Sequence, residues 1–208
     1  MPPAATRSRG IGESGGHASR VSVVRCIVAS MLAAVVVAGL VALVFWLVVR
    51  PKPIEYTVTR AVARHVSVTG DAVNATFYLT VAVDNPNRRV SMRYDNVEIR
   101  VFYGEDTQLA VADVAPSWHQ PRRNETALQV RAVARSAAVG ERAARELERD
   151  VAAGEVAVDV RVSAGVRFVV GGVASRYYHL RGTCSPVNIG LSPSAARSFK
   201  SVPCDVEI

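Results

Sequence analysis

The sequence has few of the residues from which catalytic and metal sites are built. Its four histidines lie far apart, and none has a second ligand at metal-site spacing; they are His17, His65, His119 and His179. A zinc site needs at least three protein ligands, and a catalytic site needs converging polar groups. No acidic metal motif occurs either. The sequence therefore predicts no enzyme activity, no metal and no cofactor.

Two glycine-rich matches to catalytic motifs overlap near the N-terminus. Residues 10–15 match the phosphate-binding pattern G-x-G-x-x-G, and residues 12–16 match the nucleophile pattern G-x-S-x-G. Both patterns function only where a strand turns into a helix. A short segment rich in glycine and serine offers neither element. We interpret both matches as effects of composition.

Charged residues are absent from a long apolar run, residues 26–49, which Arg25 and Arg50 flank. A helix of this length measures about 36 Å, against a hydrocarbon core of about 30 Å, so it can cross a bilayer with some tilt. A cleaved signal peptide would have an apolar region of about 7–15 residues, followed by a small-residue cleavage site. The run is longer and ends in FWLVVRP. It predicts a retained transmembrane helix.

The transmembrane helix divides the rest of the chain into four predicted parts. The first segment lacks a periodic apolar pattern and cannot offset the entropy of ordering by burial. Two prolines stiffen the segment after the helix. The remainder is long enough for one domain with its own core. The predicted parts are a disordered basic cytosolic arm (1–25), a Pro-rich linker (50–53), a folded domain (54–183) and a C-terminal tail (184–208).

The net charge of +7 is concentrated around the apolar run. Residues 1–53 carry six basic side chains and one acidic one, whereas residues 54–208 carry 19 basic and 17 acidic ones. Basic residues beside a membrane span meet anionic headgroups. The mixed charge of the remainder argues against an extended phosphate-binding surface. The lipid bilayer is therefore an expected partner, and nucleic acid is not.

Sequons and cysteines indicate the orientation of the chain in the membrane. The positive charges do not, because they flank the span on both sides. Asn74 and Asn124 begin glycosylation sequons. Cys184 and Cys204 are a matched pair beyond the span and suit a disulfide in an oxidising compartment. Closing their loop would contribute about 3 kcal/mol and would pin the tail. We expect an extracellular domain; the alternative for the pair is two free buried thiols.

The third cysteine, Cys26, lies at the inner edge of the span. A thiol in this position is a candidate for palmitoylation. The competing interpretation is an ordinary apolar residue of the transmembrane helix.

Alternating apolar and polar residues predict the secondary structure of the domain. The clearest strand covers residues 73–83, and a period of two means that one face is buried and the other solvated. One segment, residues 136–153, instead predicts a surface helix, with Ser136 as its cap and Gly154 at its end. Short strands with one inserted helix predict an antiparallel β-sandwich. The further predicted strands are 97–103, 109–111, 128–131, 155–162, 166–170 and 177–180.

Residues 85–87, Asn-Pro-Asn, follow the clearest strand and predict a turn, because Asn tolerates turn conformations and Pro fixes the next φ. Asp84 and Asp95 flank this turn, where a role in turn formation outranks a role as a general base. Tyr94 and Asp95 are expected to close the turn through side-chain hydrogen bonds. We favour a structural role for the motif over a recognition role.

The run from Asn85 to Asp95 resembles a signature of plant late-embryogenesis-abundant group two domains, in the membrane-anchored harpin-induced and non-race-specific-disease-resistance-like branch. A second signature, V-R-W-K-V-G, corresponds to residues 166–171, with Phe168 and Val169 in place of Trp and Lys. The resemblance extends over roughly residues 40–190. The positions that match the first signature are Asn85, Pro86, Asn87, Arg88, Arg89, Tyr94 and Asp95.

The resemblance implies an immunoglobulin- or fibronectin-III-like sandwich that faces the cell wall, roles in pathogen defence and abiotic stress, and no catalysis. The resulting hypothesis is a single-pass plasma-membrane protein that contacts other membrane or cell-wall proteins. Two alternatives stay open. One is a cytosol-facing tethered module that binds lipid or a stress partner. The other is a small type II enzyme of the secretory pathway. The oligomeric state is not predicted.

Overall fold

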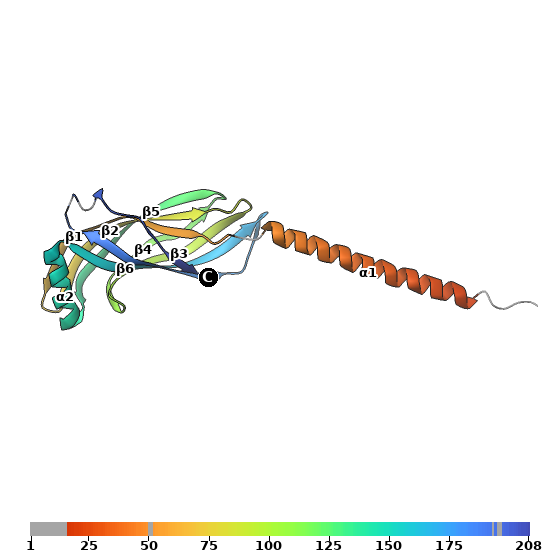
Figure 1. Cartoon of the computed structure of the whole chain (residues 1–208), viewed down its shortest axis with the longest axis horizontal. Coiled ribbons are helices and arrows are strands. Elements are labelled where there is room, and N and C mark those ends of the chain that lie inside the picture. The colour runs from red at the N-terminus through yellow and green to blue at the C-terminus, as the bar shows by residue number, and fades with distance from the viewer. Residues whose placement is uncertain (1–15, 50–51, 193, 195–196) are drawn as a thin grey trace, which may run out of the picture. The chain divides into compact units, whose positions relative to one another are not determined.

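Two units make up the chain in the computed structural model, residues 1–50 and residues 51–208. The structure describes residues 16–49, 52–192, 194 and 197–208. The two glycine-rich matches, residues 10–15 and 12–16, lie outside this part except for Gly16. The described portion of the first unit is one helix, α1 (Gly16–Val49), drawn in orange in Figure 1.

Helix α1 is longer than the predicted span. It begins ten residues before Cys26, so residues 16–25, expected to be disordered, are helical. Extending a nucleated helix costs far less than starting one, and the apolar run supplies the nucleus. Within the helix, Val23–Val44 is long and apolar enough to cross a membrane.

The second unit consists of two antiparallel sheets, which confirms the predicted β-sandwich (Figure 1). Six of the seven predicted strands lie within longer strands of the structure; in the seventh, 177–180, Tyr177 lies just outside the strand that begins at Tyr178. The first sheet has the order β5 (Asn124–Ala138), β2 (Ala72–Asn85), β1 (Glu55–Thr69) and β9 (Val202–Pro203). The second has the order β10 (Asp205–Glu207), β8 (Tyr178–Gly190), β6 (Glu155–Val170), β3 (Val90–Tyr103) and β4 (Thr107–Gln120), with β7 (Val173–Ala174) paired to β6.

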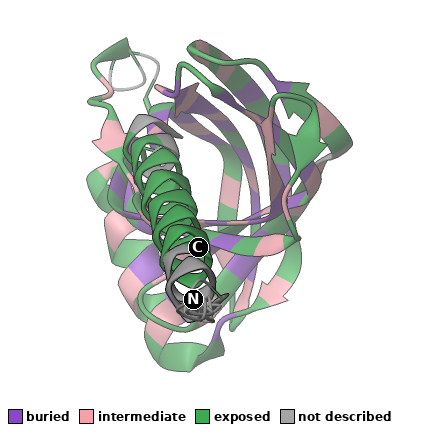
Figure 2. Ribbon diagram, turned by 90° about the vertical axis from the view of Figure 1, so that its right-hand side faces the viewer, coloured by how far each residue is buried: buried purple, intermediate pink, exposed green. Residues whose placement is uncertain are grey.

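The core lies between the inner faces of the two sheets, where Figure 2 shows the buried positions in purple. Strand alternation sends every second side chain inward. Leu79 of β2, Ile99 of β3 and Ile189 of β8 are among the fully buried large residues. Exposed polar residues such as Asn74 of β2, Arg100 of β3 and Asn188 of β8 occupy outward positions, and Tyr78 of β2 is a large aromatic residue among them.

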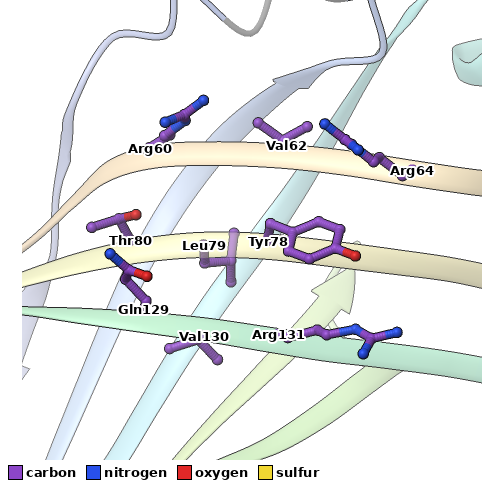
Figure 3. A pocket seen from close by; sticks show the side chains of 9 residues that line it. All are labelled: Arg60, Val62, Arg64, Tyr78, Leu79, Thr80, Gln129, Val130 and Arg131. Atoms are coloured by element: carbon purple, nitrogen blue, oxygen red, sulfur yellow. The ribbon is translucent and has the colours of Figure 1, made fainter.

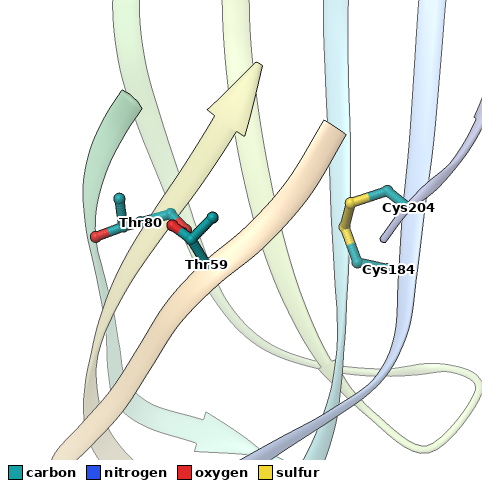
Figure 4. Close-up of a disulfide and its surroundings, with 4 residues drawn as sticks. All are labelled: Thr59, Thr80, Cys184 and Cys204. Atoms are coloured by element: carbon teal, nitrogen blue, oxygen red, sulfur yellow. A yellow bond between two sulfur atoms is a disulfide. The ribbon is translucent and has the colours of Figure 1, made fainter. Parts of the chain in front are cut away.

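Strand β1 was not predicted, because β-bulges interrupt its alternation. The register with β2 shifts between Val58 and Arg60 and again between Arg64 and Ser67. A bulge adds one residue to one strand, so two neighbouring residues can both be exposed. Thr59 lies at the first shift, and its hydroxyl donates a hydrogen bond to the carbonyl oxygen of Thr80 at 3.2 Å (Figure 4).

Helix α2 (Gly140–Ala153) begins four residues later than predicted. Ser136 does not cap it: the N-cap is Val139, which has no side-chain capping bond. The reason is that residues 137 and 138 continue β5 and pair with β2. Gly154 ends the helix in a left-handed conformation, as expected. The helix buries Ala144 and Leu147 against the sandwich.

The predicted border between domain and tail, at residue 184, falls inside β8 and is corrected by the structure. Cys184 and the six residues after it belong to this strand, and Cys184 and residues 187–190 pair with β6 on either side of a register shift. The sequence signal was weak because Pro186 lies in this part of the strand. The last residues form β9 and β10 and are therefore part of the fold.

Candidate functional site

Asn85 is the centre of a buried hydrogen-bond network at the end of β2. Its side-chain Nδ2 donates to the carbonyl oxygens of Val90 and Pro121, both at 3.0 Å. Its Oδ1 accepts from the backbone N–H of Asn87 at 3.2 Å and from Asn87 Nδ2 at 3.0 Å. Asn85 is completely buried, so each polar atom of its amide needs a protein partner.

Asn87 ties two further segments to this network. Its Oδ1 accepts from the backbone N–H of Lys52 at 2.7 Å, and its Nδ2 donates to the Lys52 carbonyl oxygen at 3.0 Å. Its own carbonyl oxygen accepts from the backbone N–H of Arg123 at 3.1 Å. The motif therefore joins the start of the unit to two loops. Lys52 lies in the predicted spacer 50–53 and yet is hydrogen-bonded to the domain.

Gln120 is a third buried amide beside the motif, and sequence reasoning missed it. Its Nε2 donates to the carbonyl oxygens of Val83 at 2.7 Å and Asn124 at 2.9 Å. These bonds link the end of β4 to the ends of β2 and β5. A glutamine is usually exposed, so no sequence signal marks this one as buried.

Tyr94 and Asp95 do not close the Asn-Pro-Asn turn, which corrects the expectation for both. Tyr94 is buried inside β3 and stacks on Trp118 of β4, with ring centroids 4.2 Å apart. Asp95 forms an ion pair with Arg167 of β6, at 3.7 Å. Both residues lie too far along β3 to reach the turn. The first signature thus has two structural parts, a turn and a strand.

The hydroxyl groups of Tyr56 and Tyr94 interact inside the sandwich. Burial raises the pKa of Tyr94 to about 12, and the Tyr56 hydroxyl beside it lowers that pKa in part. Burial, and then the charge of Tyr94, raise the pKa of Tyr56 well above its ordinary value. The two groups are close, but neither hydroxyl makes a well-formed hydrogen bond with a described residue.

We expect the domain to lose stability between about pH 10 and pH 12. The unfolded Tyr94 loses its proton near pH 10, whereas the folded one holds it to about pH 12. The unfolded state then binds fewer protons, so the free energy of unfolding falls as pH rises. Between pH 8 and pH 11, the free energy of unfolding should fall by roughly 1 kcal/mol less in Tyr94→Phe than in the wild type. Urea titrations at both values measure this, with exposed Tyr78→Phe as the control; equal losses in wild type and Tyr94→Phe would contradict it.

Arg88 and Arg89, the remaining positions of the first signature, are exposed beyond Asn87, and Pro86 is half-buried. The amides of the motif are thus engaged inside the protein, while its arginines face solvent.

A sequence profile for late embryogenesis abundant proteins matches residues 80–184, half of the chain. This chain belongs to that family. The matched range contains the Asn-Pro-Asn turn, Tyr94, Asp95 and Arg167, whereas Lys52, which is hydrogen-bonded to Asn87, lies before it.

Relatives of this late embryogenesis abundant protein occur in Arabidopsis thaliana. It is 28% identical to NDR1/HIN1-like protein 3 over 180 residues, which cover 83% of this chain and 75% of the relative. It is 26% identical to NDR1/HIN1-like protein 10 over 184 residues, 85% of this chain and 80% of the relative. The solution structure of AT1g01470 from the same plant covers 68% of this chain and 83% of its own, at 20% identity and a TM-score of 0.32.

The two sequons of this family member lie on the first sheet. Asn74 is exposed, and its Oδ1 accepts a hydrogen bond from the backbone N–H of Ser136 at 2.9 Å. Asn124 is half-buried, and its Oδ1 accepts from the hydroxyl of Thr126 at 3.1 Å. Both bonds use the amide oxygen, whereas a glycan is attached to the nitrogen. The hydrogen bonds are therefore compatible with glycosylation.

The cysteines and histidines of the described residues form no metal site. Cys184 and Cys204 are joined in a disulfide, and Cys26 lies exposed in α1. No group of three or more His, Cys, Asp or Glu side chains in this part of the chain could hold a metal ion.

Proposed function

We propose that this protein is a non-enzymatic, single-pass plasma-membrane protein with an extracellular β-sandwich. In this proposal it acts in plant defence or abiotic stress signalling through contacts with other membrane or cell-wall proteins. The observation that carries the proposal is α1, whose described span Val23–Val44 contains one charged residue, Arg25, near its start.

The exposure of α1 supports a place in lipid. Its large apolar residues, among them Val35, Leu40 and Val41, are more than half exposed. An apolar surface of this size would be unfavourable in water, at about 25 cal/mol per Å², and is satisfied by hydrocarbon. Insertion contributes roughly −0.3 to −0.6 kcal/mol for each Val, Leu, Ile or Phe near the membrane centre.

The disulfide and the sequons support an extracellular domain. Disulfides persist in oxidising compartments and are rare in the cytosol. Asn74, Asn124 and the Cys184–Cys204 bond all lie in the second unit, on the same side of the span in sequence. The NDR1/HIN1-like relatives support the role in defence.

The use of the Asn-Pro-Asn amides inside the fold determines where partners bind in this proposal. A buried amide with partners inside the protein is not available to a ligand. We therefore assign a folding role to the motif, and we assign partner recognition to the outer faces of the sheets.

We expect residues 54–208 to resist added protease in sealed microsomes, because the membrane shields them. Glycosidase treatment should increase gel mobility, and Asn74→Gln and Asn124→Gln should each remove one step of that shift. Detergent-opened vesicles serve as the control for protease activity. Cleavage of the domain in sealed vesicles, together with reduced Cys184 and Cys204, would instead support the cytosol-facing alternative.

A further inference from the structure

The outer face of the first sheet carries a shallow hollow of about 560 Å³ across β1, β2 and β5. Figure 3 shows the side chains that line it, from three neighbouring strands. Three of them are arginines, and the polar side chains of Thr80 and Gln129 lie beside them. The arginines are Arg60 and Arg64 of β1 and Arg131 of β5. We call the surface formed by these three arginines and Tyr78 the arginine surface.

Tyr78 lies in the middle of the arginine surface, on β2. The guanidinium carbon of Arg64 lies 5.8 Å from its ring centroid, and that of Arg131 lies 6.0 Å away. Guanidinium groups at this distance are attracted by the aromatic ring. The tyrosine therefore holds two cations on neighbouring strands, and 41% of its own surface stays exposed.

The three arginines have no carboxylate partner among the ion pairs of the described residues. All three are exposed. The acidic residues of this face form a separate row across the three strands, in which Glu55 of β1 lies opposite Asp84 of β2, and Asp84 lies opposite Glu125 of β5. This row lies four residues along β2 from Thr80, or about 13 Å, which exceeds the screening length in physiological salt. The surface is thus locally cationic although the unit is nearly neutral.

A second hollow of about 560 Å³ continues the arginine surface along β1. It shares Arg60 and Arg64 with the first and adds His65 and Arg197. Two shallow hollows with shared cationic residues form a track, which suits an extended polymer better than a compact small molecule.

We propose that the arginine surface binds a carboxylated polysaccharide, an assignment that rests on the proposed extracellular placement. Arginine binds carboxylates through two parallel hydrogen bonds. Tyr78 offers an apolar face to a sugar ring, and Thr80 and Gln129 offer hydrogen bonds to its hydroxyl groups. Charge complementarity selects an anionic partner, and the repeated carboxylates of a polyuronate match the spaced guanidinium groups.

A peptide fits this surface less well. Extended peptides bind sheets at an edge, where main-chain groups are free to pair. The arginine surface is the face of a sheet, and its middle strand, β2, is paired on both sides. A peptide laid across this face would leave its own backbone groups without partners.

The test uses the full-length protein in nanodiscs of neutral phosphatidylcholine, with polygalacturonate oligomers as the probe. We expect saturable binding that weakens as salt rises. The triple variant R60Q/R64Q/R131Q should bind at least about tenfold more weakly, because it removes three charged hydrogen-bonding groups. The matched control R93Q/R122Q/R181Q has the same net charge and leaves the arginine surface intact, so it should bind as wild type does.

Two further comparisons separate the proposed ligand from other anions. Tyr78→Ser should weaken binding, whereas Tyr78→Phe should preserve it, because the ring and not the hydroxyl meets the sugar. Methyl-esterified polygalacturonate, which lacks the charges, should bind weakly. Equal loss in both triple variants, or equal binding of phosphatidylserine vesicles at the same surface, would overturn the proposal. Because the binding assay does not depend on orientation in the cell, a cytosolic domain in the protease experiment would contradict the proposed function separately.

Discussion

Asn85→Ala is expected to lower the free energy of unfolding of the second unit by about 3–4 kcal/mol. The substitution leaves the carbonyl oxygens of Val90 and Pro121 and the backbone N–H of Asn87 without their side-chain partner. Each buried group that loses its hydrogen bond costs about 1–3 kcal/mol. The loss extends to the loop after β4, which Pro121 begins.

The measurement is urea unfolding followed by tryptophan fluorescence in a Trp46→Phe background. Trp118 is then the one tryptophan of the chain, and it stacks on buried Tyr94. Its emission therefore reports unfolding of the sandwich.

Two variants control the Asn85 experiment. Asn188→Ala removes an exposed amide from β8 and should change stability by less than about 0.5 kcal/mol. Asn85→Asp keeps the shape but replaces the donor with an oxygen facing two carbonyl oxygens, so it should be about as damaging as alanine. If Asn85→Ala has the same free energy of unfolding as the wild type, the motif is not structural, and a recognition role becomes the better interpretation.

The strands were predictable where burial alternates without interruption. Residues 73–83 lie inside β2, and 155–162 and 166–170 together make up most of β6. In both strands one face packs on the core, so apolar and polar residues alternate in the sequence with a period of two. Strand β1 lacks that clarity, because its two register shifts place polar residues side by side. The alternation of apolar and polar residues cannot identify a strand that β-bulges interrupt.

The site was predictable only as a turn. Asn85 and Pro121 are 36 residues apart, and Asn87 and Lys52 are 35 apart. Nothing local in the sequence indicates which distant carbonyl a buried amide will meet. The arginine surface was missed for the same reason, since Arg60, Tyr78 and Arg131 become neighbours only through the register of three strands.

The disulfide fixes a segment that bridges the two sheets. β9 pairs with β1 of the first sheet, and β10, which one residue separates from β9, pairs with β8 of the second. Cys204 lies between them, and its backbone N–H donates to the carbonyl oxygen of Tyr56 at 2.9 Å. The disulfide joins it to Cys184, which is buried in β8 (Figure 4). The segment thus covers the edges of β1 and β8, which would otherwise offer unpaired backbone groups.

The double variant Cys184→Ala/Cys204→Ala is expected to lose about 3 kcal/mol of unfolding free energy, because the bond closes a loop of about 20 residues in the unfolded chain. Reduction of the wild type should give the same loss, and Cys26→Ala, which removes the exposed cysteine of α1, should give none. Without the bond, β9 and β10 provide only a few backbone pairs to hold the segment. Hydrogen exchange should therefore rise first at residues 202–207 and then along the edges of β1 and β8. Unchanged exchange at these edges would show that strand pairing alone closes the sandwich.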